Sequence, residues 1–192
     1  MDQGDEELLS LLATDLDSHF RRLVETYQQR LYLFALRLTG HPADAEDIVQ
    51  EAFLRAYHAL KGFPGFKIRL VKLRQWLYAI TLNVFRNRKR RPEHPLVPLD
   101  LSEGSPLLEI ADQAPGPEEE ADRHEWQREL GKYLTALPEI YRTAITLFYF
   151  ENLSYTEIAE LLNQPVGTVK GHISRAKRLL QKLLVTQENG AE

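Results

Sequence analysis

The chain has 192 residues, enough for one medium domain or two small ones, each with a modest hydrophobic core. Its 43% hydrophobic and 27% charged content is typical of a globular protein, and no apolar run approaches the roughly 20 residues that a bilayer span needs. The chain contains no cysteine, which excludes disulfides and thiolate metal sites. Its acidic first residues lack the order of a secretion signal, so we expect a cytoplasmic protein without direct membrane insertion.

The net charge of −4 conceals an uneven distribution of charge along the chain. Residues 1–19 carry six acidic side chains and no Lys or Arg, whereas residues 61–91 carry ten Lys or Arg and no Asp or Glu. Residues 93–125 hold ten acidic side chains opposed by Arg123, and residues 161–187 hold five basic side chains and no acidic ones. Two basic blocks separated by an acidic one indicate two anion-binding surfaces, although a solvated helix face is the alternative for either block alone.

Three helices are predicted before residue 92. They span residues 17–39, 42–61 and 68 or 71 to 91. The turns Gly40-His41-Pro42 and Gly62-Phe63-Pro64-Gly65 separate them, and Pro92 prevents the third from continuing, because a proline inside a helix removes a hydrogen bond and clashes with the preceding turn. We therefore expect an acidic N-terminal tail at 1–16 and a helical domain of three to four helices at 17–91.

Residues 92–117 are predicted to be a flexible linker, because they hold six of the ten prolines and no helical period. Four helices are predicted after it: residues 118–136, residues 138–150, a short helix that begins at Ser154, and residues 168–185. They define a C-terminal domain at 118–186, followed by a C-terminal tail at 187–192. Since no segment shows useful strand alternation, we expect an all-α fold of two small helical domains.

The second predicted helix has one apolar and one acidic face. Small and apolar residues recur at spacings of three and four from Ala45 to Leu60, which predicts the buried side. The acidic face carries Asp44, Asp47 and Glu51, and is flanked by Ile48 and Leu54. An acidic face edged by aliphatic side chains suits docking on a protein surface, and an ordinary solvated face is the alternative.

The third predicted helix is apolar on two sides, so a polar strip between them is expected to face outward. This strip comprises Lys72, Gln75, Ala79, Asn83 and Arg86, and continues into Arg88, Lys89, Arg90 and Arg91. Basic side chains neutralise phosphates, while Asn and aromatic side chains hold unstacked bases. The preceding loop places Phe63 and Phe66 beside the strip, which favours capture of single-stranded nucleic acid; a lid on the core is the alternative for these rings.

The last two predicted helices form a helix-turn-helix pattern. A support helix buried through Ile158 and Ala159 is followed by a turn at residues 164–167. In such a motif the exposed N-terminal part of the second helix enters the major groove. The side chains expected to point outward are Thr168, Lys170, Gly171, His172, Arg175 and Arg178. A plain helical hairpin is the alternative.

Four sequence blocks resemble, in order, those of extracytoplasmic-function sigma factors of the sigma-70 family. They are DAEDIVQEAFLRAY (44–57), LRQWLYAITLNVFRNRKRR (73–91), LPEIYRTAITLFYFENLSYTEIAELL (137–162) and PVGTVKGHISRAKRLL (165–180). The resemblance covers about residues 20–91 and 123–184. It implies a transcription initiation factor that binds core RNA polymerase and promoter DNA, is held by an anti-sigma factor, and needs no cofactor or metal.

The resemblance assigns roles to residues at matching positions. The polymerase-binding residues would be Asp44, Asp47, Gln50, Glu51 and Leu54. The −10 element would be opened and held by Phe63, Phe66, Lys67, Lys72, Trp76, Asn83, Arg86, Arg88, Lys89 and Arg90. The −35 element would be read by Thr168, Lys170, Gly171, His172, Arg175 and Arg178. Gly171-His172 stands where relatives often have Ser-Arg, which leaves those contacts open.

Two other classes of function account for less of the sequence. A dimeric helix-turn-helix repressor or activator explains the C-terminal domain, but gives no role to the first basic block or to the acidic face. An enzyme is not expected, because the six histidines are scattered and no phosphate-binding loop or nucleophile motif is present. The chemistry of transcription would belong to the polymerase.

Overall fold

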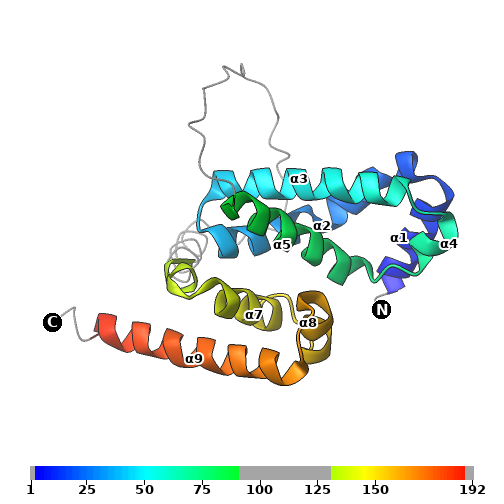
Figure 1. Ribbon diagram of the computed structural model, residues 1–192. Helices are drawn as coiled ribbons and strands as arrows, with labels where there is room; N and C mark the ends of the chain where they lie inside the picture. Colours follow the sequence, from blue (N-terminus) through cyan, green and yellow to red (C-terminus); the bar gives the residue numbers. More distant parts are fainter. Residues whose placement is uncertain (1–2, 91–130, 189–192) are drawn as a thin grey trace, which may run out of the picture.

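The computed structural model describes residues 3–90 and 131–188, and every element in these ranges is a helix (Figure 1). The helices are α1 (Gln3–Thr14), α2 (Leu16–Thr39), α3 (Pro42–Lys61), α4 (Gly65–Arg69), α5 (Leu73–Arg90), α7 (Glu139–Tyr149), α8 (Tyr155–Leu162) and α9 (Val166–Glu188). Residues 131–136 are also helical. The expected all-α class is confirmed. The linker expected at 92–117 lies outside the described residues, as does most of the helix expected at 118–136.

The helix ends follow local signals in the sequence. Asp15 caps α2 by accepting a hydrogen bond from the Ser18 amide at 3.2 Å, and Gly40 ends that helix with a φ of 78°, which a glycine adopts without strain. Ser154 and Glu157 form the capping box of α8, each side chain bonding the other residue's amide. The expected helix boundaries therefore hold to within a few residues, apart from the shorter α5.

The acidic N-terminus differs from the expected tail. Residues 3–14 form α1, and its Leu8, Leu9 and Leu12 are at most 3% exposed. Leucines at spacings of three and four bury one side of the helix, while its carboxylates stay on the other. The acidic composition of this segment masked that apolar side.

The N-terminal region is a bundle in which α2, α3 and α5 pack side by side, with α1 and α4 at one end (Figure 1). The apolar side expected for the second helix is buried here as α3, from Ala45 to Leu60. The Tyr78 ring of α5 meets the Phe34 ring of α2 edge-on, with centroids 5.0 Å apart. This core fixes which side of α5 remains at the surface.

The C-terminal region packs against this bundle rather than standing apart from it. In Figure 1, α7 and α8 lie below α2 and α5, and α9 forms the outer edge. Leu147, Ile158 and Val169 belong to the same buried cluster as the core of the bundle. The Arg142 guanidinium donates to the Leu38 carbonyl at the end of α2. The two described regions therefore share one large apolar cluster, and a second, smaller cluster of Leu134, Leu137, Ile145 and Ala176 lies within the C-terminal region.

Candidate nucleic-acid interface

The polar strip of α5 lies at the boundary between the two regions. Lys72 and Asn83 are exposed, as are Arg88, Lys89 and Arg90, whereas Gln75 and Arg86 are half-buried. Trp76 is half-buried and packs on the core. The strip therefore has the expected order along α5, but its middle is partly covered by the C-terminal region.

Carboxylates of the C-terminal region form ion pairs with cations of this strip. Glu139 of α7 accepts from Arg86 Nε at 3.3 Å and from Lys89 Nζ at 3.2 Å. Glu160 of α8 accepts from Lys72 Nζ at 2.7 Å. Partial burial would raise the pKa of Glu139, but the hydrogen bonds from Lys89 and Arg86 hold it below the usual value. Three cations of the strip are thus paired with carboxylates of the chain itself.

Two uncharged side chains, Gln75 and Tyr78, also donate hydrogen bonds to carboxylates at this boundary. The Gln75 amide donates to Glu157 Oε1 at 2.8 Å. Glu151, only 6% exposed, accepts from the Tyr78 hydroxyl and from Arg37 Nη1, the latter at 3.2 Å. Burial raises the pKa of Glu151 despite these donors. The pairing of glutamates with this strip was not predicted from the sequence. The only hint was that the few acidic residues between 139 and 160 are separated from one another, while the helix that they contact contains no acid.

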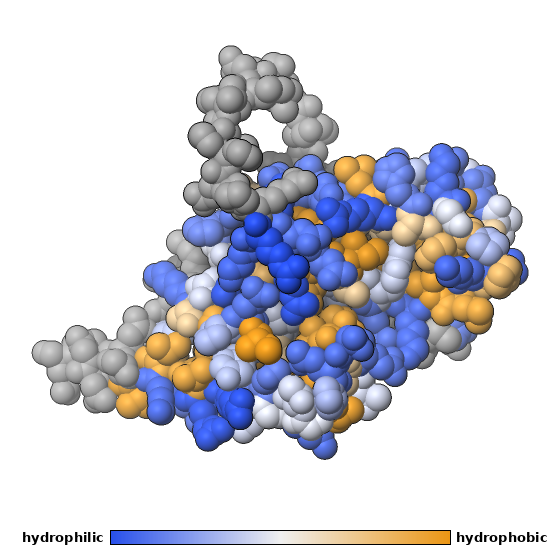
Figure 2. Space-filling model, viewed as in Figure 1, coloured by the Kyte–Doolittle hydropathy of each residue, from blue (hydrophilic) through white to orange (hydrophobic). Residues whose placement is uncertain are grey.

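The loop before α5 is the short helix α4 and its preceding turn. Phe66 is 69% exposed, whereas Phe63 is half-buried against the core. Lys67 Nζ lies 3.8 Å from the centroid of the Phe63 ring. Figure 2 shows a hydrophobic area at this end of the molecule, on the right of the view. The Phe63 ring thus packs on the core, as in the alternative interpretation of this loop, and the Phe66 ring faces solvent.

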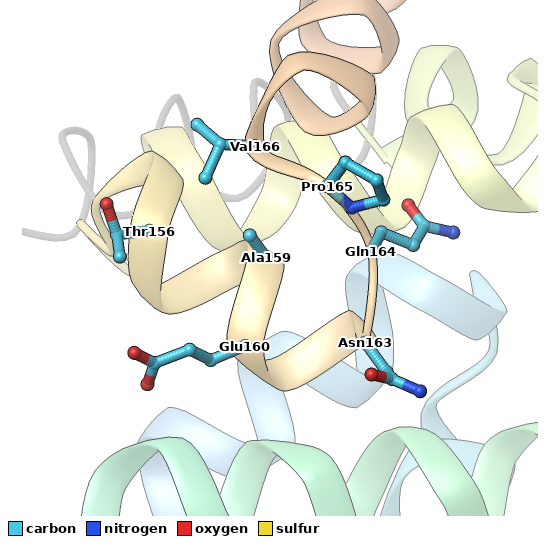
Figure 3. Close-up of a pocket in the computed structure, with 7 residues that line it drawn as sticks. All are labelled: Thr156, Ala159, Glu160, Asn163, Gln164, Pro165 and Val166. Atoms are coloured by element: carbon cyan, nitrogen blue, oxygen red, sulfur yellow. The ribbon is translucent and has the colours of Figure 1, made fainter.

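The helix-turn-helix is formed by α8, a turn, and α9. An open hollow of about 410 Å³ lies at this turn. Among the residues that line it, Glu160 and Asn163 lie on the side that faces the bundle (Figure 3). Asn163 ends α8 at a φ of 51°, which reverses the chain. Thr168, Lys170, Arg175 and Arg178 are exposed on the first turns of α9. This is the placement required to enter a major groove.

His172 does not point outward as expected. It is 8% exposed and meets the Tyr141 ring of α7 at 5.6 Å between centroids. Burial, followed by the charge of Arg175, lowers the pKa of His172. Position 172 turns toward α7 because it lies three residues after Val169 and four before Ala176, which are both buried in α9. Gly171 is half-buried beside it.

Comparison with known proteins gives two family matches that coincide with these regions. Residues 23–93 match Sigma-70 region 2, and residues 127–180 match Sigma-70, region 4. The chain is 36% identical over 169 residues to the ECF RNA polymerase sigma factor SigW of Bacillus subtilis (strain 168), covering 86% of this chain and 88% of SigW. The chain belongs to the extracytoplasmic-function sigma factors.

Other similarities extend over nearly the whole sigma factor. It is 33% identical to the RNA polymerase sigma-H factor of Pseudomonas aeruginosa over 186 residues, 95% of this chain and 94% of that one. The solved structure of CnrH in complex with the cytosolic domain of CnrY is similar with a TM-score of 0.67 and 27% identity, covering 95% of this chain and 97% of that chain. The function read from the four sequence blocks, an RNA polymerase sigma factor for transcription initiation, is therefore confirmed.

The acidic face of α3 is at the surface of the sigma factor as expected. Asp44, Asp47 and Gln50 are exposed, Glu51 is half-buried, and Leu54 is 58% exposed. Ile48, expected to flank this face, is instead 1% exposed and part of the core. A single aliphatic side chain, Leu54, therefore edges the acidic face.

One ion pair joins this face to the strip of α5. Asp47 Oδ2 accepts from both terminal nitrogens of Arg88 at 3.0 Å. The two candidate surfaces for polymerase and DNA are thus adjacent at the end of α5.

Among the residues that the structure describes, no helix combines the length and the apolar character that a bilayer span needs.

Proposed function

We propose that this sigma factor docks on core RNA polymerase through the α3 face, engages the −10 element through α4 and α5, and reads the −35 element through α9. The observation that carries this proposal is the exposure of Thr168, Lys170 and Arg175 at the start of α9 in a chain whose α5 bears a second cationic strip. Phosphate contacts supply affinity, while side chains at base edges supply sequence choice. The protein itself would perform no covalent chemistry, and would act in the cytoplasm with the polymerase.

Engagement of the −10 element would exchange carboxylates for phosphates on α5. Lys72, Arg86 and Lys89 cannot neutralise a DNA backbone while Glu139 and Glu160 hold them. We propose that the α7–α8 side moves away from α5 when the sigma factor binds polymerase and promoter. Because the Lys72–Glu160 pair is exposed and the pairs of Glu139 are only partly buried, each is weak, and a polyanion with many charges can displace them together.

The α4 segment would contribute the contacts to an unpaired base. Phe66 is an exposed ring next to Lys67, a combination that binds single strands by stacking and charge. Asn83 is exposed on the same strip and can hydrogen-bond a base edge. Strand opening would be favoured because these groups bind the separated strand and not the duplex.

An inhibitory partner is the remaining part of the proposal. CnrH was solved in complex with the cytosolic domain of CnrY, and we propose that this chain likewise has an anti-sigma partner. Recovery of polymerase but never of a second protein, in a pulldown of this chain from its host, would argue against that partner.

The test of the proposed function is run-off transcription with purified core polymerase and host upstream DNA. Transcripts that start at discrete sites and require this protein would support it and would map both promoter elements. Tight duplex binding by the protein alone, without any dependent transcript, would instead favour a dimeric helix-turn-helix regulator.

A further inference from the structure

The short helix α4 cannot define its own position. It has five residues, and a helix shorter than about 12 residues is marginal in water without tertiary packing. Its buried side chain is Ile68, at 4% exposure, while Phe66 and Leu70 are 69% and 77% exposed. Its N-cap, Pro64, provides no side-chain hydrogen bond. Whatever packs against α4 therefore decides where Phe66 and Leu70 point.

The packing partner of α4 is α1. Of the described helices, α1 makes the closest packing on α4, and Figure 1 shows the two together at the end of the bundle farthest from α9. At Gly65 the two backbones nearly touch: a Cβ added to Gly65 would lie 3.0 Å from the carbonyl oxygen of Ala13. Such a distance leaves no room for any other residue without a shift of one helix.

Helix α1 is itself held firmly on α2. The Tyr27 hydroxyl donates to Asp5 Oδ1 at 2.5 Å, and Arg22 pairs with Glu7 at 3.1 Å. Leu8, Leu9 and Leu12 are buried beneath these polar contacts. Because α2 is a long helix of the core, the position of α4 is tied through α1 to the rigid part of the bundle.

The region 2 match begins at residue 23 and so leaves α1 outside it. We infer that α1 is a positioning element for −10 recognition: it holds α4 so that Phe66 and Leu70 face the separated DNA strand. This inference rests on the role proposed above for α4. A role limited to covering the core would predict that α1 affects stability without a specific effect on single-strand binding.

The test is a pair of glycine substitutions separated by three residues. Gly65→Ala requires α4 and α1 to move apart by a few tenths of an ångström, whereas Gly62→Ala is its matched control, since a Cβ there would lie at an ordinary 3.6 Å from the Ala59 carbonyl oxygen. The probe is a single-stranded DNA with the non-template −10 strand of a promoter mapped by run-off transcription. Its binding to the reconstituted holoenzyme is followed by fluorescence anisotropy.

We expect Gly65→Ala to weaken binding of this strand about fivefold, because a displaced Phe66 ring loses part of its stacking on the base. Gly62→Ala should bind as the unmodified protein does. Affinity for core polymerase and for a −35 duplex should be unchanged in both variants. Tyr27→Phe, which removes the hydrogen bond to Asp5, should weaken strand binding in the same direction but less.

The outcomes separate this inference from the proposed function. Equal strand binding by Gly65→Ala and Gly62→Ala would overturn the positioning role while leaving the sigma-factor assignment intact. A parallel loss of strand, polymerase and −35 binding in Gly65→Ala and Tyr27→Phe, with a lower Tm, would show that α1 serves stability alone and would also overturn it. If Phe66→Ala left strand binding unchanged, the role of α4 in the proposed function would fail, and the inference would fail with it.

Discussion

The two basic surfaces of the molecule are in opposite states. On α5, Lys72, Arg86 and Lys89 are ion-paired with carboxylates of α7 and α8. On α9, the ion pairs of the described residues include neither Lys170 nor Arg175, and both are exposed. Two acid-free basic blocks of the sequence therefore differ in how readily they bind an anion.

The difference indicates an order of events at a promoter. A surface whose cations are not held by carboxylates meets DNA without a preceding change, whereas a paired surface must first lose its internal anions. The α9 contacts would accordingly form on closed duplex, and the α5 contacts would follow as the α7–α8 side moves away. The same comparison explains why single substitutions on the two surfaces should differ in size and even in sign.

The largest effect is expected on the free surface. Lys170→Ala or Arg175→Ala should weaken binding to a −35 duplex by about 1–3 kcal/mol if a base contact is lost. Duplex affinity of the holoenzyme, measured on matched and mismatched −35 sequences, checks this. Lys132→Ala, an exposed lysine outside α9, is the control and should bind normally. A uniform loss on all sequences would mean that the residue contacts phosphate and not a base.

The paired surface should respond in the opposite direction. Glu139→Gln with Glu160→Gln releases three cations of α5, so affinity of the free sigma factor for single-stranded DNA should rise. If all three then contact phosphates, the slope of log K against log salt should steepen by about 2, since each contact to a single strand adds roughly 0.7. A salt titration of DNA binding measures both quantities.

Glu46→Gln is the control for that gain, because Glu46 is exposed on α3 and its substitution changes net charge by the same unit. If Glu46→Gln raised the affinity for single-stranded DNA by the same amount per unit of charge, the gain in the double variant would come from the change in net charge and not from released cations. No rise in the double variant would mean that the carboxylates do not compete with DNA, and the proposed order of events would be wrong.

A smaller effect on the fold is expected at the contact between α3 and α5. Asp47→Ala removes a half-exposed ion pair with Arg88, and such surface pairs contribute about 0–1 kcal/mol, so the Tm should change little. Affinity for core polymerase should nevertheless fall, because Asp47 lies on the proposed docking face. Pulldown with core polymerase and thermal unfolding check the two parts. Unfolding of the variant would show that Asp47 supports the bundle instead.

The fold was largely predictable from the sequence, because its signals are local. Caps at Asp15 and Ser154, the glycine at residue 40 and the apolar spacing of α3 each act within one helix. The N-terminal helix was not predicted, since its three buried leucines are few beside its carboxylates. Its stability comes from packing on α2 and α4, which no local pattern reveals.

For the candidate site, the sequence could predict the exposure of single residues but not their pairing across the two regions. Exposure of Lys170 follows from helical period, so this position could be read directly. Phe66 was expected in a loop, where no period distinguishes its exposed ring from the half-buried ring of Phe63. Pairing of Glu139 with Arg86 and Lys89 joins residues about fifty positions apart and depends on how two regions meet. The predictions that Ile48 and His172 lie at the surface were wrong because each residue is at the edge of a buried stripe. With about 100° of rotation per residue, helical period does not decide whether such a side chain is buried or exposed.

The smallest effect concerns His172, whose burial distinguishes it from the exposed residues of the same helix. Because its pKa in the folded protein is lowered, the neutral form is favoured, and its contribution to stability is present above pH 6.5 and is lost as the pH falls through the lowered value. His172→Gln should therefore flatten the dependence of Tm on pH between neutral and mildly acidic conditions. Exposed His41→Gln should leave that slope unchanged. If instead the affinity for the −35 duplex lost its pH dependence in His172→Gln, while the Tm kept its own, His172 would be a DNA contact after all. The comparison of the two surfaces would then need a further cation on α9.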